Sequence, residues 1–407
     1  PDTAPAPAPA PDPGTVPGPG TAPGDVPAPD PGDAPDPSAV RHQLRRLLRD
    51  RPARPWPGRP ARPARALLVG NYGNGNAGDE SILASLADLA GGHRDRLTVV
   101  SRDPDAVTAL HGLRAVRTTS PGAVAAFLRA DAVAVGGGGM FGRGLPPLVR
   151  VLPAVLLAAR LLGKEVHLVA LGAYPDTPPA TRYLLRRAAR GAAAVTVRDT
   201  ATRRVLSSGP ARRVRPVLVP DPATALAPAE PARVEADTGV DPASRPLVVN
   251  LKAMPDRTAL DQAVDALARA LAAWGGEVPV VLLGMSDRGD YGLGPGHCDL
   301  ALAAELARRA GWSTGRGGRA VGGGRRVTAV GPGLHPSVTK ALLGAARGVV
   351  AMRLHAQIHA VAQHTALFAV AFEPKSFSFL SAAGVPAHRP GRFSTADVAA
   401  WLDALPR

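Results

Sequence analysis

Short apolar runs alternate with longer amphipathic stretches along most of the chain. From Ala66 onward, the apolar runs end in glycine or a polar residue, and stretches with helical spacing follow them, for example at 80–90 and 122–130. Alternating strands and helices of this kind are typical of a parallel sheet with helices on both faces. The predicted strands lie at 66–70, 97–101, 132–136, 166–172, 194–199 and 217–221.

A second series of the same kind follows a break at 227–246, which is rich in Pro, Ala and charged residues. We therefore predict an α/β fold of two doubly wound, Rossmann-like domains that face a cleft, at residues 66–230 and 245–407. Ligands of such sheets bind beyond the carboxyl ends of the strands. Residues 312–325 are rich in glycine and predict a flexible loop. The predicted strands of this series lie at 247–252, 278–286, 326–332, 348–355 and 366–373.

The first 65 residues have a different composition. Residues 1–38 hold only small residues, Pro and six Asp, and predict a disordered tail. Residues 39–50 have the spacing of a short basic amphipathic helix, and 51–65 return to a Pro/Arg linker. We expect the folded part to begin near Arg65 and residues 39–65 to contact an acidic membrane surface, with a solvated linker as the alternative.

The formal net charge of +15 predicts acidic partners, with a compositional bias of the genome as the alternative explanation. The single cysteine, Cys298, allows no intramolecular disulfide, so we expect a cytoplasmic protein, at the inner face of the plasma membrane if residues 39–65 dock there. The most apolar stretch, at 145–163, is interrupted by Arg150, Pro153 and Arg160. It predicts a packed helix rather than a membrane span.

The stretch V-G-N-Y-G-N-G-N-A-G-D-E at 69–80 contains G-x-G-x-x-G, the outline of a dinucleotide-binding loop. Asp103, after the second strand, would then hold the ribose. Asp79 and Glu80 open the next helix, however, and two carboxylates would oppose a pyrophosphate at a helix N-terminus. They suit sugar hydroxyls better, and a capping role for Asp79 is the alternative. A second cluster, Gly136–Gly139, brings backbone close to a ligand or makes a tight turn.

Basic residues follow two other predicted strands. Arg353 and His355 lie two positions apart after an apolar run, so strand geometry would aim both side chains into the cleft. An arginine can clamp a carboxylate or phosphate, and a histidine can act as a general acid. Arg198 would be a second clamp from the other domain. The alternatives are a surface ion pair, a buried structural histidine, or a two-histidine metal site with His359, although no H-E-x-x-H pattern accompanies it.

Six motifs in a fixed order resemble those of the polysaccharide pyruvyl transferases, over residues 66–385. The resemblance implies a GT-B-like enzyme of cell-wall polysaccharide biosynthesis. Such an enzyme transfers pyruvyl from phosphoenolpyruvate to a sugar of a polysaccharide or its lipid-linked precursor, forming a ketal and releasing phosphate. It implies no tightly bound cofactor and leaves a divalent ion open. The motifs are Gly73–Glu80, Gly136–Gly139, Val197–Asp199, Asp221–Ala223, Arg353–Ala356 and Glu373–Lys375.

The resemblance assigns roles to particular residues. Donor binding and proton transfer fall to His355, Arg353 and Arg198. We place a second group around the donor and the sugar acceptor: Gly75, Asn76, Asp79, Glu80, Gly137, Gly138 and Lys375.

Two other functions remain open on the sequence. A GT-B-type glycosyltransferase would need an acid for the nucleotide ribose, and Glu373 is the candidate. A non-catalytic binder of anionic polymers would be driven by the positive charge. Four Trp and four Tyr give little stacking surface and no nucleic-acid motif occurs, so we predict no nucleic-acid partner.

Overall fold

The computed structural model describes residues 35–51, 62–142, 146–208, 214–275, 278–292, 294–314, 319–322 and 325–406. Residues 35–407 form one compact unit. Most of the predicted tail, the middle of the predicted Pro/Arg linker and parts of the glycine-rich stretch at 312–325 lie outside the described residues.

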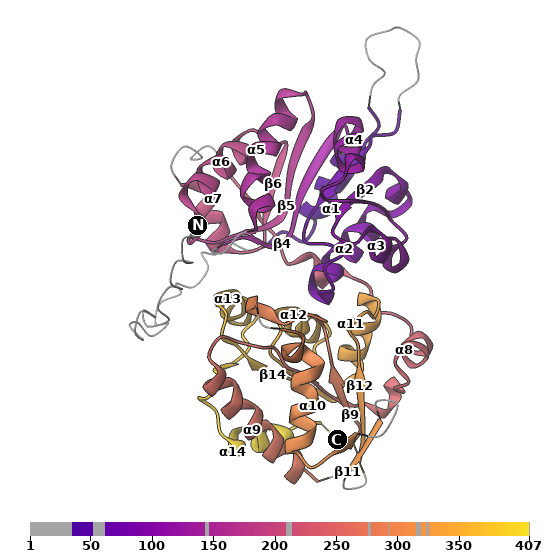
Figure 1. Ribbon diagram of the computed structural model, residues 1–407, viewed down its shortest axis with the longest axis vertical. Helices are drawn as coiled ribbons and strands as arrows, with labels where there is room; N and C mark the ends of the chain where they lie inside the picture. Colours follow the sequence, from indigo (N-terminus) through magenta and orange to yellow (C-terminus); the bar gives the residue numbers. More distant parts are fainter. Residues whose placement is uncertain are drawn as a thin grey trace, which may run out of the picture. The chain divides into compact units, whose positions relative to one another are not determined.

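Seven parallel strands form the first sheet, in the order β3-β2-β1-β4-β5-β6-β7 (Figure 1). Helices cover both of its faces: α1, α2 and α3 pack on one, and α4 to α7 on the other. The strands are β1 (Ala66–Val69), β2 (Leu97–Ser101), β3 (Arg114–Arg117), β4 (Ala132–Phe141), β5 (Glu165–Ala173), β6 (Ala194–Val197) and β7 (Val217–Leu218). The helices are α1 (Ala39–Leu48), α2 (Ala77–Ala90), α3 (Pro104–His111), α4 (Pro121–Arg129), α5 (Pro147–Leu161), α6 (Pro179–Arg190) and α7 (Thr200–Ser207).

Eight strands form the second sheet, in the order β10-β11-β12-β9-β8-β13-β14-β15. All neighbours are parallel except at one edge, where β11 runs antiparallel to β10 and β12. The strands are β8 (Leu247–Asn250), β9 (Val280–Leu283), β10 (Ser313–Thr314), β11 (Arg319–Gly322), β12 (Arg325–Val330), β13 (Gly348–Ala351), β14 (Leu367–Val370) and β15 (Ala387–His388). The helices are α8 (Pro231–Thr238), α9 (Arg257–Ala273), α10 (Asp299–Arg309), α11 (Pro336–Ala345), α12 (Leu354–Ala362), α13 (Pro374–Ala382) and α14 (Thr395–Asp403).

The core of the second half also has two layers. Helices α9, α10 and α14 bury their apolar faces on one side of the sheet, and α8, α11 and α12 on the other. Short 3-10 helices complete the chain: η2 (Gly91–Arg96), η4 (Pro222–Ala225), η5 (Pro242–Ser244), η6 (Asp290–Gly292) and η7 (Pro295–His297).

The strand order reverses once in each sheet, between β1 and β4 in the first and between β8 and β13 in the second. At such a point the chain leaves neighbouring strands in opposite directions, which opens a crevice beyond their carboxyl ends. The loops after these four strands are therefore where a ligand would bind. The first glycine cluster follows β1, Lys252 follows β8 and the Arg353–Ala356 motif follows β13, whereas the second glycine cluster lies within β4 itself.

The predicted α/β class with two doubly wound sheets is confirmed. Four strands escaped the sequence analysis. β3 is an edge strand whose exposed Arg114 and Arg117 hide its apolar character. β10 and β11 fall in the stretch at 312–325 that was predicted to be a loop, and β15 has only two residues.

Helix α1 corrects the prediction that folding begins near Arg65. Its apolar residues recur at positions 40, 44, 47 and 48, and this stripe is buried in the core of the first sheet. The side-chain amide of Gln43 is buried as well. Its Nε2 donates to the Leu168 carbonyl at 2.8 Å, and its Oε1 accepts from Thr196 Oγ1 at 2.7 Å. The helix is thereby fixed to β5 and β6, so its apolar face is not available to a membrane.

Replacing Leu47 by Ala should destabilise the protein by about 2–5 kcal/mol, because the fully buried side chain would leave a cavity. The exposed Arg45 on the same helix is the matched control, and Arg45→Ala should change the free energy of unfolding by about 0.5 kcal/mol or less. Urea unfolding of both variants measures the difference. Equal midpoints would contradict a packed α1.

Candidate functional site

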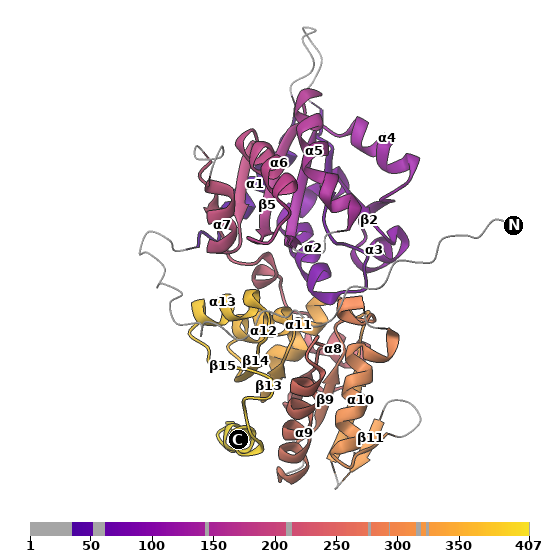
Figure 2. The ribbon, with the colours of Figure 1, turned by 60° about the vertical axis from the view of Figure 1, so that its left-hand side comes forward.

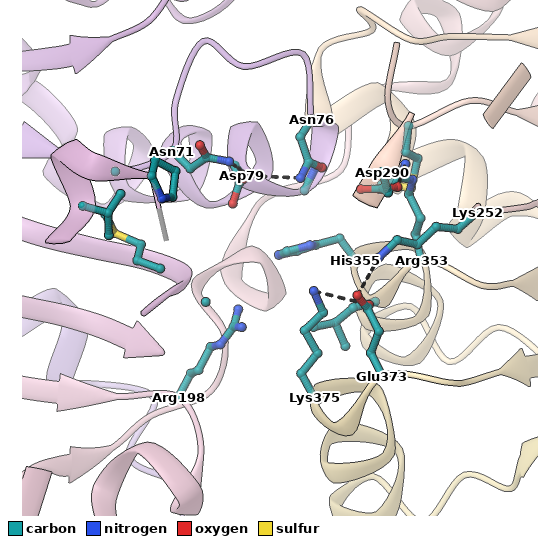
Figure 3. Close-up of a pocket in the computed structure, with 18 residues that line it drawn as sticks. Asn71, Asn76, Asp79, Arg198, Lys252, Asp290, Arg353, His355, Glu373 and Lys375 are labelled. Carbon is teal, nitrogen blue, oxygen red and sulfur yellow. Dashed lines mark hydrogen bonds and ion pairs between the residues drawn. The ribbon is translucent and has the colours of Figure 1, made fainter. Parts of the chain in front are cut away.

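The carboxyl ends of strands from both sheets line a pocket of about 320 Å³, within the range of small-molecule sites (Figure 3). Its walls include Asn71 after β1, Met140 in β4 and Met285 after β9. Eight ionisable side chains face it: Asp79, Arg198, Lys252, Asp290, Arg353, His355, Glu373 and Lys375.

The glycine loop delivers Asp79 to the pocket from the first turn of α2. Asn76 is the N-cap of this helix, and its Oδ1 accepts from the Gly78 N–H at 3.0 Å. Asp79 is therefore free of the capping role that the sequence left open. Its Oδ2 accepts instead from the side-chain amides of Asn71 at 2.7 Å and Asn76 at 3.0 Å. Two neutral donors hold the carboxyl group in place.

Burial raises the pKa of Asp79 to about 6, although the hydrogen bond from Asn71 opposes the shift. Glu80, its neighbour, contributes to the increase by like-charge repulsion. A carboxyl group with this pKa exchanges its proton near physiological pH, which is the property of a general acid or base.

Glu80 does not line the pocket, which corrects its predicted place beside the ligand. Its Oε1 accepts from the Gly73 N–H at 2.7 Å, and its Oε2 lies 2.7 Å from His111 Nε2. Both partners are buried with it. Glu80 therefore holds the glycine loop in shape.

Three predicted glycines also lie outside the pocket lining. Gly75 has a left-handed φ of 68°, and a Cβ there would meet the Asp287 side chain. Gly137 and Gly138 are in β4 with positive φ, where a Cβ would meet Ile82 and Asp79 of α2. The second glycine cluster thus lets β4 pack closely against α2. Only its last member, Gly139, lines the pocket.

Arg198 enters the pocket from the end of β6. Its Nη1 donates to Asp221 Oδ2 at 3.1 Å and its Nη2 to Tyr174 Oη at 2.9 Å. Burial opposes the charge, but Tyr174 and Asp221 outweigh it and raise the pKa of Arg198 above its usual value. The guanidinium is a fixed cation at one side of the pocket (Figure 3).

Arg353 and His355 lie together in the pocket, but not through strand geometry. β13 ends at Ala351, Arg353 is the N-cap of α12, and His355 is in its first turn. The predicted strand was too long because the apolar run V-V-A-M continues past the last residue that pairs with β14. The helix start, and not an extended backbone, aims the two side chains.

The Arg353 guanidinium is already paired, which limits its predicted role as an anion clamp. Its Nε and Nη2 donate to the two carboxylate oxygens of Asp299 at 2.6 and 2.7 Å, and Nη2 also reaches Asp290 at 2.7 Å. Asp299 is fully buried. The same network continues through Asn250, whose Oδ1 accepts from the Arg353 N–H at 3.1 Å. Arg353 therefore fixes the start of α12.

His355 packs against the glycine loop. A Cβ on Gly78 would lie 2.2 Å from His355 Nδ1, so only glycine fits beneath the ring. The other ring nitrogen lies 3.8 Å from Asp221 Oδ2. Burial lowers the pKa of His355 to about 4; Asp221 opposes the shift, while Arg198 and Lys375 reinforce it. The imidazole is thus neutral at pH 7.

His359 joins the two halves of the chain through the first turns of α2. Its Nε2 lies 2.9 Å from Ser81 Oγ, and that hydroxyl donates to the Ala77 carbonyl at 2.6 Å. The Ala77 N–H in turn donates to Met285 O at 2.8 Å. Helix α2 is therefore fastened to the second half of the chain at two points. In the part of the chain that the structure describes, no group of three side chains suits a metal ion.

Glu373 holds two lysines at the far wall of the pocket. Its Oε1 accepts from Lys252 at 2.8 Å and from Tyr291, and its Oε2 lies 3.3 Å from Lys375. Burial opposes ionisation, but Lys375 and Lys252 lower the pKa of Glu373 to about 2. Lys375 is the more exposed lysine, so its ammonium group remains accessible to a ligand.

Several residues that line the pocket or hold its side chains in place escaped the sequence analysis. Asn71 follows β1 directly, and its position at the strand end was a signal that could have found it. Asp221 belongs to a quoted motif but received no role. Asp290, Asp299 and Tyr174 are distant in sequence from their arginine partners, so only the fold brings them there.

Comparisons with known proteins agree with this architecture. The family model for polysaccharide pyruvyl transferases matches residues 76–374. A comparison with curated proteins finds no match. Anabaena Alr3699/HepE, solved in complex with UDP and glucose, is similar with 13% identity and a TM-score of 0.50 over 84% of this chain and 89% of that one.

Two further solved structures are similar. UDP-GlcNAc 2-epimerase from Methanocaldococcus jannaschii has 9% identity and a TM-score of 0.51, over 84% of this chain and 92% of that one. The MnaA protein of S. aureus, solved with UDP, has 11% identity and a TM-score of 0.51, over 84% and 87%. At these identities the likeness concerns the fold alone, and it confirms the predicted GT-B-like arrangement.

The Arg353 network yields a stability prediction. Asp299→Asn removes the negative charge to which Nε and Nη2 of the buried Arg353 donate. The variant should be destabilised by about 3–5 kcal/mol. The exposed pair of Arg233 with Asp237 is the control, and Asp237→Asn should cost about 1 kcal/mol or less. Urea unfolding measures both. A similar small loss in the two variants would mean that Arg353 does not depend on Asp299.

Proposed function

We propose that this chain, which belongs to the polysaccharide pyruvyl transferase family, transfers a pyruvyl group from phosphoenolpyruvate to two hydroxyls of one sugar. The acceptor sugar would belong to a polysaccharide or to its lipid-linked precursor. One observation carries the proposal: four cations, a neutral imidazole and a carboxyl group with a pKa of about 6 surround one pocket.

Arg198 and Lys375 are the cations best placed for an anionic donor. Arg198 is held by Asp221 and Tyr174, so its orientation is set before a ligand arrives. Lys375 is the accessible ammonium group opposite (Figure 3). Phosphoenolpyruvate carries a phosphate and a carboxylate on one small skeleton, and an arginine with a lysine matches these two groups. Arg353 would act mainly by holding the N-terminus of α12.

We propose a role for His355 that differs from the general acid predicted from the sequence. With a pKa of about 4, its imidazole is neutral near pH 7 and suits a general base that takes a proton from an acceptor hydroxyl. Asp79, with a pKa of about 6, suits the general acid that protonates the methylene carbon of the donor. A bound anionic donor would raise the pKa of Asp79 further and keep its proton in place.

The proposed reaction balances with these two groups. Asp79 delivers a proton to the methylene carbon, which becomes a methyl group, and the first hydroxyl oxygen bonds to the adjacent carbon as it loses its proton to His355. The carbon–oxygen bond to phosphate then breaks, and the second hydroxyl oxygen bonds to the same carbon. Of the two hydroxyl protons, one replaces the proton that Asp79 gave and the other leaves with the phosphate.

A nucleotide-sugar glycosyltransferase is the second candidate. Glu373 is an acid at the end of a strand of the second sheet and lines the pocket, which is what a ribose would need. Lys252, Tyr291 and Lys375 already bind this carboxylate, however. We therefore favour the donor with two anionic groups.

A binding titration with the full chain tests the donor. We expect phosphoenolpyruvate to bind, UDP-glucose and NAD not to bind, and Arg198→Ala to weaken phosphoenolpyruvate binding about tenfold or more, because a charge-assisted contact is lost. The exposed Arg233 on α8 is the matched control, and Arg233→Ala should leave binding unchanged. His355→Asn should keep binding but lower kcat about 10²–10⁴-fold, as expected for a proton-transfer residue. Binding of UDP-glucose alone would favour the glycosyltransferase.

The pH dependence of kcat/KM tests the proposed role of Asp79 as the general acid. Because Asp79 is protonated only below its pKa of about 6, kcat/KM should fall about tenfold per pH unit above that value. Asp79→Asn should lower kcat and remove this limb, and the control Asp105→Asn in α3 should leave it in place. A limb that persists in Asp79→Asn belongs to the donor phosphate or to another group, and would remove the acid role from Asp79.

A further inference from the structure

Exposed apolar side chains gather on one face of the first half of the chain. Seven of them lie on α4, on α5 and at the residue after α5, and together we call them the α4–α5 face. The described residues elsewhere carry only three large apolar side chains of comparable exposure: Tyr183, Val217 and Tyr291. The face consists of Val124, Leu128, Leu148, Val151, Val155, Leu161 and Leu162.

Helix α5 is apolar on both sides. Leu156 and Ala159 are buried against the sheet, as the predicted packed helix requires. The opposite stripe, Leu148, Val151 and Val155, has helical spacing and is exposed. A surface helix normally turns polar residues outward, so this face is exceptional.

The end of α5 is the most exposed part of the face. Leu161 is 90% exposed and Leu162 is 59% exposed, and they stand between Arg160 and Lys164. Lys164 Nζ donates to the carbonyls of Leu128 and Ala130 at 3.0 and 2.6 Å. The end of α4 is therefore tied to the segment that follows α5.

The helices of the face carry charges of one sign, and Asp131, the acid near Lys164, is paired with Arg62. Helices α4, α5 and α6 contain no Asp or Glu, and α5 and α6 lie side by side (Figures 1 and 2). Among the described residues, no carboxylate pairs with the exposed Arg129, Arg160 or Arg190. The arginines of helices α4, α5 and α6 are Arg129, Arg150, Arg160, Arg182, Arg186, Arg187 and Arg190.

We propose that the α4–α5 face docks on the surface of an anionic lipid bilayer. Exposed leucines and valines on helices that carry arginines and no acids are the composition of an interfacial membrane site. A second copy of the chain fits poorly, because a two-fold interface would bring like-charged arginines together. The structure has no membrane-crossing helix among its described residues, so contact would be peripheral. The site differs from the predicted one at 39–65, whose apolar stripe is buried.

The position of α5 connects this face to the pocket. Pro146 and Val149, at the start of the helix, line the pocket, and the helix runs from there to Leu161 over about 22 Å. A chain docked along α5 would hold the pocket near the lipid headgroups, where a lipid-linked sugar could reach it. This consequence rests on the proposed function, whereas docking itself does not.

Vesicle co-sedimentation of the full chain, without substrate, tests the proposal. We expect binding to phosphatidylcholine vesicles that contain about one third phosphatidylglycerol. Binding to vesicles of phosphatidylcholine alone, or at high salt, should be weaker by about tenfold or more. Leu161→Ser with Leu162→Ser should lower binding about tenfold or more, and Arg129→Gln with Arg160→Gln should act similarly. Circular dichroism checks that each variant is folded.

Matched controls lie away from the face. The exposed Val217 and Arg392 should be replaceable by Ser and Gln without loss of vesicle binding. Absence of binding by the native chain, or unchanged binding in both double variants, would overturn the proposal. So would loss of binding only in Arg41→Gln with Arg45→Gln, the exposed arginines of α1. Double variants that dissociate a native dimer in light scattering, with vesicle binding unchanged, would make the face a contact between copies.

Discussion

The pair of Arg353 and Asp299 is the contact on which the pocket of this protein depends. Asp299 accepts from both Arg353 nitrogens and from the Met285 N–H at 2.9 Å, and Asn250 accepts from the Arg353 N–H. These residues follow or end β13, β9 and β8, which are adjacent in the sheet. The network therefore ties three strand ends together at the point where the strand order reverses. It sets where α12 begins, and with it the position of His355.

Burial shifts the pKa values of an acid, Asp79, and a base, His355, in the same pocket. It raises the pKa of Asp79 and lowers the pKa of His355, so that both side chains tend to be uncharged. Most of the cations nearby have acids as partners, which keeps the pocket from being strongly positive before a ligand enters. A carboxyl group that exchanges its proton near pH 6 and a neutral imidazole, beside fixed cations, form an arrangement that an anionic ligand would complete.

The sequence predicted the parts of the molecule that repeat a local pattern. The central strands and the loops after them were found because apolar runs and glycines are visible in a short window. The same local logic misplaced Glu80, because its contact with His111 cannot be seen in a window around residue 80. Asp299 was missed for this reason too. The basic spacing of α1 was correct for a helix, yet its burial depends on β5 and β6, more than a hundred residues away.

Because of this separation in sequence, α1 and its partner strands are synthesised at different times. The helix leaves the ribosome first, and the partners of Gln43 on β5 follow 125 residues later. At about 5–20 residues per second, this delay lasts about 6–25 s. During that time α2 and the first strands can cover part of the stripe of Val40, Leu44 and Leu47, but β5 is not yet there to complete the packing. The nascent chain therefore carries a partly uncovered apolar helix, the kind of segment that a holding chaperone binds.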